Sequence, residues 1–358
     1  MLARADPDSG DIAARVLAGE ERALARLLSG LEDQSPWAGA ALAALRRSSA
    51  RDSRAARIVG VTGPPGTGKS TLVDKLIGIY RGRGERVGVL AVDPSSPFSG
   101  GAILGDRIRM QGSPREARAV DGGLFIRSLA SRGRLGGLSR STSRAARALE
   151  AAGFGIVLVE TVGIGQSEVD IARLADSVVL VTMPSAGDEI QTIKAGIMEI
   201  GDVFVVNKAD REGADRMVRQ LRSALELSRS ALELSPAGPE ARPSYAAHPA
   251  PPPRSPADDS PLVLKTVAET GEGVAELVEV LDARWAKLRD SGRLEERRRR
   301  GALAEARSLL ADRVLGELEA LEGGLEERLA DEIVRGELEA AEAATLLFDS
   351  IRRGGARA

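Results

Sequence analysis

Cysteine is absent from this 358-residue chain, and histidine occurs only once, at position 248. The missing cysteine excludes disulfides, thiolate metal sites and cysteine nucleophiles. His248 lies in Tyr-Ala-Ala-His-Pro-Ala-Pro-Pro-Pro, a composition that favours a solvated loop residue over a metal ligand or a general base. Histidine chemistry is therefore not expected either.

The chain also has few aromatic residues and a small net charge. Aromatic side chains make up 3% of the chain, too few to stack nucleic-acid bases, and 50 Lys and Arg nearly balance 52 Asp and Glu. No run reaches the ~20 apolar residues of a membrane span. Asp6, Asp8 and Asp11 argue against a transit peptide. We therefore expect a cytoplasmic protein that binds neither nucleic acid nor membrane.

The segment Gly63-Pro64-Pro65-Gly66-Thr67-Gly68-Lys69-Ser70 matches the pattern G-x-x-x-x-G-K-[ST]. It follows the apolar run Ile58–Val61 and precedes Thr71–Ile77, whose apolar spacing is helical. In this context the glycines let backbone N–H groups approach phosphate oxygens closely. Lys69 is expected to reach the β- and γ-phosphates, and the Ser70 hydroxyl to hold Mg²⁺. The segment, with Thr71, predicts a nucleotide-binding site.

Seven segments rich in Val, Ile and Leu alternate with helical stretches and predict strands that are buried on both faces. They are Arg57–Thr62, Arg86–Val92, Leu124–Ser128, Gly155–Glu160, Ser177–Thr182, Asp202–Val206 and Leu262–Val267. This alternation predicts an α/β fold with a doubly wound, mostly parallel sheet. Ligands of such sheets bind outside the carboxyl ends of the strands, so the residues that follow each strand are the candidates for function.

Carboxylates follow two of these predicted strands. Asp93 opens a loop rich in proline and glycine, and Asp106 lies further along the same loop. Glu160 ends the fourth predicted strand, three residues before Gly163. Carboxylates beside a phosphate loop suit Mg²⁺ or the water that it holds, and the Gly163 N–H could contact the γ-phosphate.

A candidate base-recognition loop, Asn207-Lys208-Ala209-Asp210, follows the sixth predicted strand. A carboxylate at Asp210 can accept hydrogen bonds from the N1–H and amino group of guanine, which adenine does not offer. Asn207 and Lys208 would brace the loop. A backbone N–H at Val267 or Ala268, after the last strand, could contact the guanine oxygen. The sequence therefore favours GTP over ATP.

The regions outside this core are mostly helical in pattern. Residues 1–56 predict one helix over Asp11–Leu28, with Ile12, Val16, Leu17, Leu24, Leu27 and Leu28 on one face, and a second over Pro36–Arg47. The GTPase domain is expected to span residues 57–290. Residues 235–261 hold nine of the 17 prolines and predict an extended or disordered insert.

A C-terminal helical arm is expected over residues 291–358. An apolar stripe, interrupted by Gly323-Gly324, includes Leu310, Val314, Leu318, Leu321, Leu325, Leu329 and Ile333. This stripe could pack against a second subunit or against the chain's own core, and the pattern leaves both open. The run Arg297–Arg300, after Glu295-Glu296, predicts a solvated helix face.

Several motifs together resemble the methylmalonyl-CoA mutase-associated GTPases of the MeaB/ArgK type. They are Gly63–Ser70, Val92–Pro97, Gly105–Met110, Glu160–Glu168 and Ala195–Ile200. The resemblance implies a P-loop NTPase that hydrolyses GTP with Mg²⁺ and acts as a chaperone. Its partner would be an adenosylcobalamin-dependent acyl-CoA mutase, with methylmalonyl-CoA mutase as the first candidate. The chaperone would gate the loading of the cofactor into that mutase and its protection.

The same resemblance implies residue roles. Lys69, Asp93, Asp106 and Glu160 would be catalytic, with Ser70 and these three carboxylates around the metal. The segment Pro184–Lys194 would be a switch toward the mutase, with Asp188, Gln191 and Lys194 as its key positions. The C-terminal helices would hold a homodimer.

Two departures from the family pattern stand out, a longer proline-rich insert and Ile190-Gln191-Thr192-Ile193-Lys194 in place of Leu-Gln-Gly-Ile-Lys.

Nickel-inserting GTPases are a weaker alternative, because they handle the metal with His and Cys and this chain has one His and no Cys. A P-loop kinase of a transport system and a slow GTP-dependent scaffold remain alternatives. Gln166 comes three residues after Gly163 rather than directly after it, so we expect slow intrinsic hydrolysis that a partner accelerates.

Overall fold

The computed structural model describes residues 8–49, 55–94, 122–131, 137–161, 167–184, 200–233, 262–319 and 324–354. Asp106, Gly163, Asp188, Gln191, Lys194 and the proline-rich segment 235–261 lie outside the described residues, and so does the side chain of Asp93. The chain divides into two compact units, residues 1–301 and residues 302–358.

One seven-stranded sheet forms the centre of the first unit, in the order β3-β2-β4-β1-β5-β6-β7, and every neighbouring pair is parallel. The strands are β1 Arg57–Thr62, β2 Val87–Pro94, β3 Leu124–Ser131, β4 Ile156–Thr161, β5 Ser177–Thr182, β6 Val203–Val206 and β7 Leu262–Lys265. All seven predicted strands are present. Their ends differ most at β2 and β3, which run further than predicted because they pair with each other up to Pro94 and Ser131.

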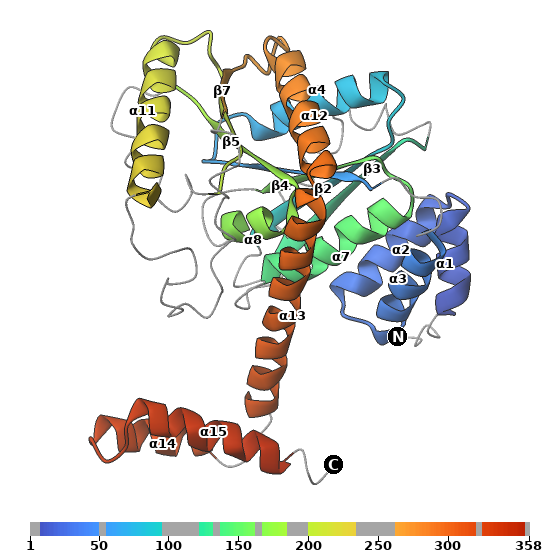
Figure 1. The fold of residues 1–358 in the computed structure, drawn as a ribbon. Coiled ribbons are helices and arrows are strands. Elements are labelled where there is room, and N and C mark those ends of the chain that lie inside the picture. The colour runs from blue at the N-terminus through green and yellow to red at the C-terminus, as the bar shows by residue number, and fades with distance from the viewer. Residues whose placement is uncertain are drawn as a thin grey trace. The chain divides into compact units, whose positions relative to one another are not determined.

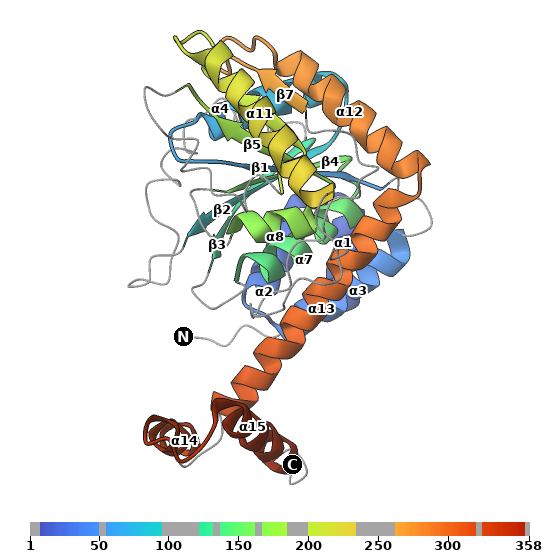
Figure 2. The same ribbon diagram turned by 60° about the vertical axis from the view of Figure 1, so that its left-hand side comes forward.

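Helices cover both faces of this sheet, which confirms the predicted doubly wound architecture (Figures 1 and 2). On one face α4 (Lys69–Gly82) and α12 (Val274–Asp290) share an apolar core with alternate strand residues such as Val59 and Val61. The other face carries α7 (Gly137–Ala151), α8 (Ser167–Leu174) and α11 (Ala214–Glu233). Since side chains alternate along a strand, both faces of β1 and β5 are apolar and buried.

Three N-terminal helices extend the layer that contains α7: α1 (Ser9–Leu17), α2 (Glu21–Glu32) and α3 (Pro36–Ser49). The prediction of one helix over Asp11–Leu28 is wrong. Gly19 adopts φ 83°, and the Glu20 N–H bonds back to the Arg15 carbonyl, a glycine-dependent helix end. The break leaves Leu17 45% exposed, although the periodic pattern predicts it on the apolar face.

The C-terminal part of the chain is helical, as predicted, with α13 (Arg293–Glu319), α14 (Leu325–Val334) and α15 (Ala340–Gly354). Within the second unit α14 packs on α15, and Leu329 and Ala343 are buried there. Gly324, with φ 62°, precedes α14, in agreement with the predicted interruption of the stripe. Leu310 of that stripe is 63% exposed. The run Arg297–Arg300 is not a uniformly solvated face, because Arg297 and Arg298 pair with buried carboxylates.

Candidate nucleotide site

The loop between β1 and α4 lies at the carboxyl edge of the sheet. Three of its glycines have positive φ, 140° at Gly63, 78° at Gly66 and 87° at Gly68. A Cβ atom added at Gly63 would lie 2.0 Å from the Val181 carbonyl oxygen of β5. Only glycine therefore lets the loop leave β1 this close to β5. Pro65, Gly66 and Ser70 form the exposed part of the loop, whereas Pro64 and Thr71 are half-buried.

The Lys69 side chain is buried, with 7% of the residue exposed, at the first position of α4. Its ammonium group donates to the carbonyl oxygens of Gly63 at 2.8 Å and Pro64 at 2.9 Å. The Thr67 hydroxyl donates to the same Pro64 oxygen at 2.9 Å. The charge is thus placed inside the curve of the loop, where several backbone N–H groups at a helix start already favour an anion.

Glu160 lies beside this loop at the end of β4. The register pairs it with Val61 of β1, and only 2% of the residue is exposed. The Ser70 hydroxyl donates to the Glu160 carboxylate, so the two predicted metal ligands are direct neighbours. One residue further, the hydroxyl of Thr161 donates to that of Thr62 at 2.9 Å and ties the ends of β4 and β1 together. This buried threonine pair was not among the predicted site residues.

Asp93 belongs to β2, the strand next to β4, and stands two residues past Ala91, the partner of Glu160. Its backbone is therefore at the same carboxyl edge as the phosphate loop. Among the described residues, no three His, Asp or Glu side chains cluster closely enough to hold a metal ion by themselves. In the described part of the chain, Ser70 and Glu160 are the predicted metal ligands that the fold brings together.

Asn207 joins the loop after β6 to the phosphate loop. Its amide nitrogen donates to the Thr67 carbonyl at 2.7 Å. Its amide oxygen accepts from the Ala268 N–H at 2.9 Å and from the Thr266 hydroxyl at 3.0 Å. Asn207 is 1% exposed, so its side chain acts as a buried cross-link between three loops.

The rest of the predicted base loop surrounds this cross-link. Lys208 adopts φ 55°, and its ammonium group donates to the Gly66 carbonyl at 2.8 Å. Asp210 is exposed. The Val267 N–H donates to the Glu272 carbonyl at 3.0 Å, and the Ala268 N–H donates to Asn207. Both N–H groups that were predicted to contact the guanine oxygen thus already have acceptors within the protein. Thr266, whose hydroxyl bonds to Asn207, was not among the predicted site residues, and a hydroxyl residue directly before Val267-Ala268 is the sequence signal for it.

No helix in the described segments is both long enough and apolar enough to span a membrane.

Comparison with known proteins gives a consistent result over most of the chain. The family described as "Methylmalonyl Co-A mutase-associated GTPase MeaB" matches residues 24–322. A protein of Pyrococcus horikoshii that is named as a GTPase is 42% identical over 337 residues, which cover 94% of this chain and 96% of that protein.

Two further similarities concern an animal protein and a solved structure. The mouse protein named "Methylmalonic aciduria type A homolog, mitochondrial" is 36% identical over 67% of this chain and 52% of its own length. A crystal structure titled "LAO/AO transport system kinase" superposes with a TM-score of 0.67 at 25% identity, covering 98% of this chain and 100% of that one.

Proposed function

The chain belongs to the MeaB family of methylmalonyl-CoA mutase-associated GTPases, and from that premise we propose that it is a chaperone that uses GTP to gate adenosylcobalamin loading into an acyl-CoA mutase. That the chain is a GTPase follows from the family and the P-loop fold. The observation that carries the chaperone role is the family match over residues 24–322, which includes the switch segment Pro184–Lys194. The name of the mouse relative, a methylmalonic aciduria homolog, supports a mutase of methylmalonyl-CoA as the partner.

For hydrolysis we assign the phosphates to the loop Gly63–Thr71. The buried Lys69 ammonium group would exchange its two carbonyl partners for β- and γ-phosphate oxygens and offset their growing charge as the terminal P–O bond breaks. Since its position is already fixed by the loop, little reorganisation is needed. The Gly163 N–H is proposed to contact the γ-phosphate.

Mg²⁺ fits the residues that are present. Ser70 and Glu160 offer oxygen atoms of the kind that this ion prefers, and they already lie within hydrogen-bonding distance of each other. Mg²⁺ usually takes one or two protein ligands and completes its shell with phosphate oxygens and water, which agrees with the small protein ligand set here. We propose Asp93 and Asp106 as the further carboxylates of this shell. When bound, the ion would neutralise phosphate charge.

Asp210 is proposed to recognise guanine, and GTP is expected to bind more than tenfold tighter than ATP. The loss of two hydrogen bonds to a charged carboxylate exceeds the ~1.4 kcal/mol that corresponds to a tenfold change. Asp210→Asn should shift the preference toward xanthosine nucleotides. Calorimetry with the three nucleotides measures this. The exposed Glu212, in the turn that follows, offers the control Glu212→Gln, which should keep the preference for GTP. Equal affinities of the wild type for GTP and ATP would contradict the assignment.

The chaperone role is tested by steady-state GTP hydrolysis with and without a cobalamin-dependent mutase from the same genome. Slow basal hydrolysis should rise at least about tenfold with the mutase, since a partner that completes such a site accelerates it strongly. Lys194→Ala should keep the basal rate within about twofold and lose most of the acceleration. If no such mutase changes the wild-type rate, the chaperone proposal fails, and transfer of phosphate to a protein or a slow scaffold role becomes the better hypothesis.

The proposed homodimer, held by the C-terminal helices, depends on the family and on the exposed apolar residues of that unit. Leu310, Val334 and Phe348 are 63%, 86% and 53% exposed. Exposed apolar surface of this kind is typical of a helical region that packs against a partner.

A further inference from the structure

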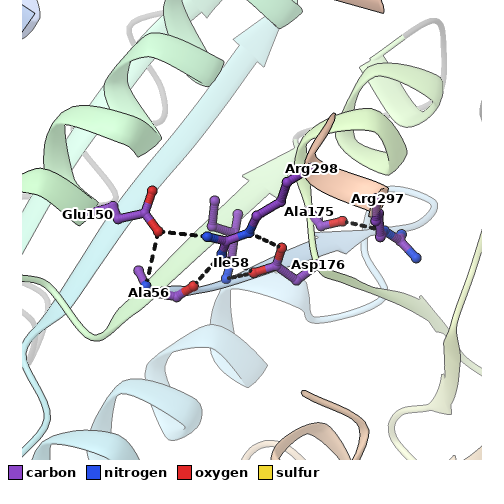
Figure 3. A network of polar contacts seen from close by, with 7 residues as sticks. All are labelled: Ala56, Ile58, Glu150, Ala175, Asp176, Arg297 and Arg298. Atoms are coloured by element: carbon purple, nitrogen blue, oxygen red, sulfur yellow. Dashed lines mark hydrogen bonds and ion pairs between the residues drawn. The ribbon is translucent and has the colours of Figure 1, made fainter. Parts of the chain in front are cut away.

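Arg298, in the second turn of α13, makes four hydrogen bonds at the amino edge of the sheet (Figure 3). Its guanidinium donates to both oxygens of Asp176, at 3.0 and 2.7 Å, and to Glu150 of α7 at 2.8 Å. It also donates to the Ala56 carbonyl, directly before β1, at 2.6 Å. Burial alone lowers the pKa of Arg298, but these two carboxylates outweigh that effect and hold it above its ordinary value. Arg298 is therefore a permanent charge at the junction of α7, β1 and β5.

Arg297, the preceding residue, makes the equivalent contacts one strand further along the sheet. It donates to the Ala175 carbonyl before β5 at 3.0 Å and to Asp202, before β6, at 3.3 Å. Arg284 of α12 donates to the other Asp202 oxygen at 2.6 Å. The side chains of Asp176 and Asp202 are both 2% exposed. Arg298 and Arg297 therefore each help to neutralise a buried carboxylate.

Asp176 and Asp202 use the same device to join neighbouring strands. The Asp176 carboxylate accepts from the Ile58 N–H at 2.9 Å, and the Asp176 N–H donates to the Ile58 carbonyl. Asp202 does the same with Val178, at 2.8 Å in each direction. Asp176 thus fixes β5 against β1, and Asp202 fixes β6 against β5. Any sliding between these strands must strain the bonds that the two arginines complete.

Four residues of α13, at positions 294, 297, 298 and 301, contact the rest of the first unit and form what we call its docking face. Leu294 is 7% exposed, and a Cβ atom added at Gly301 would lie 2.6 Å from the Arg173 carbonyl, so glycine is needed for the close approach to α8. This spacing places the four residues on one side of the helix. From residue 302 onward, none of the α13 side chains that the structure describes is buried. Within the first unit, α13 is thus held by the two arginines, the buried Leu294 and the close approach at Gly301.

Each of the three strands that this face touches leads, at its opposite end, to a part of the candidate nucleotide site or of the proposed switch. β1 leads into the phosphate loop at Gly63, β6 leads into Asn207, and β5 ends two residues before the segment that begins at Pro184. A strand of four to six residues is a rigid connection roughly 13–20 Å long. Because the Asn207 side chain ties the loop after β6 to the phosphate loop after β1, the carboxyl end of β5 is the one that can shift relative to the other two. Such a shift would be transmitted along the strands to their amino ends.

We propose that Arg297 and Arg298 are positioning residues that couple the attachment of α13 to the nucleotide state of the site at the far end of β1, β5 and β6. Buried ion pairs of this geometry have discrete arrangements, made or broken, which is what a coupling element requires. The helix that they hold continues into the C-terminal unit. The coupling requires GTP binding but not the proposed mutase partner, so it can fail or hold independently of the chaperone role.

The test compares Arg298→Gln with the matched control Arg300→Gln in the full-length protein. Arg300 lies half a turn along α13, is 53% exposed at its side chain and, within the described part of the chain, pairs with Glu296 one turn before it. Affinities for GDP and for a non-hydrolysable GTP analogue are measured by calorimetry. Coupling of the usual size changes the ratio of the two affinities by roughly fivefold or more in Arg298→Gln. Arg300→Gln should keep the wild-type ratio. A purely structural role would lower the melting temperature without changing this ratio.

A second variant and a reciprocal measurement complete the design. If Arg298→Gln does not fold, Arg297→Gln replaces it, because Arg284 still pairs with Asp202 there. By linkage, amide exchange over residues 302–319 of the wild type should differ at least about threefold between the GDP and GTP-analogue forms. A ratio change below fivefold in the variant that folds, or equal exchange in the two nucleotide forms, overturns the proposal.

Discussion

Lys69→Ala is expected to weaken GTP binding by at least about 100-fold. The Lys69 residue is 7% exposed, and its ammonium group lies inside the phosphate loop, where it is proposed to exchange the Gly63 and Pro64 carbonyls for phosphate oxygens. Each hydrogen bond between two charged groups contributes about 1.5–3 kcal/mol, so the loss of two exceeds the ~2.7 kcal/mol of a 100-fold change. Calorimetric titration of GTP into the wild type and the variant measures the difference.

The control for this variant is Lys287→Ala, which removes an exposed lysine near the end of α12. Its GTP affinity should stay within about twofold of the wild type, since an exposed charge outside the site is screened by solvent and salt. A Lys69→Ala protein that still binds GTP within tenfold of the wild type would show that Lys69 is not the main phosphate ligand.

Asp202→Ala is expected to lower the free energy of unfolding by about 3–5 kcal/mol. The substitution leaves the guanidinium groups of Arg284 and Arg297 without their carboxylate and the Val178 N–H without its acceptor. Removing one partner of a buried ion pair carries a penalty of about this size, because the remaining charge is uncompensated. Urea denaturation followed by circular dichroism gives the value.

Two further variants make the stability test specific. Asp202→Asn keeps an acceptor for the Val178 N–H but not the charge, so its loss should be smaller than that of Asp202→Ala. Asp290→Ala removes a carboxylate that is 67% exposed and, among the described residues, pairs with its neighbour Arg289, and should change stability by less than about 1 kcal/mol. Equal losses for Asp202→Ala and Asp290→Ala would show that the buried pair contributes little.

Local patterns were sufficient to predict the sheet. A strand buried on both faces is a continuous apolar run, and the Gly-rich loop and Asn207–Asp210 follow such runs directly, so their place at the carboxyl edge follows from the topology alone. The prediction of one helix over Asp11–Leu28 was wrong because the apolar periodicity continues across Gly19. Periodicity alone does not reveal a glycine that adopts a left-handed backbone conformation and ends the helix.

Contacts between distant residues could not be predicted in this way. The run Glu295–Arg300 contains charges at the spacing of pairs within one helix, and Arg300 does pair with Glu296 in this manner. Arg298 instead reaches Ala56, 242 positions away in the sequence, because the tertiary fold places the amino ends of the strands next to α13. The Asn207–Thr266 bond and the Thr62–Thr161 pair are of the same kind.

The cross-link made by Asn207 has a consequence for the entropy of ligand binding. One buried amide bonds to the Thr67 carbonyl, the Thr266 hydroxyl and the Ala268 N–H, and so holds the three loops together. Many binding sites order their loops only when the ligand arrives, at a cost in conformational entropy. The bonds of Asn207 place that cost for these three loops in folding instead. For these three loops we therefore expect a small loss of conformational entropy when a nucleotide binds, so that more of their contact energy remains for affinity.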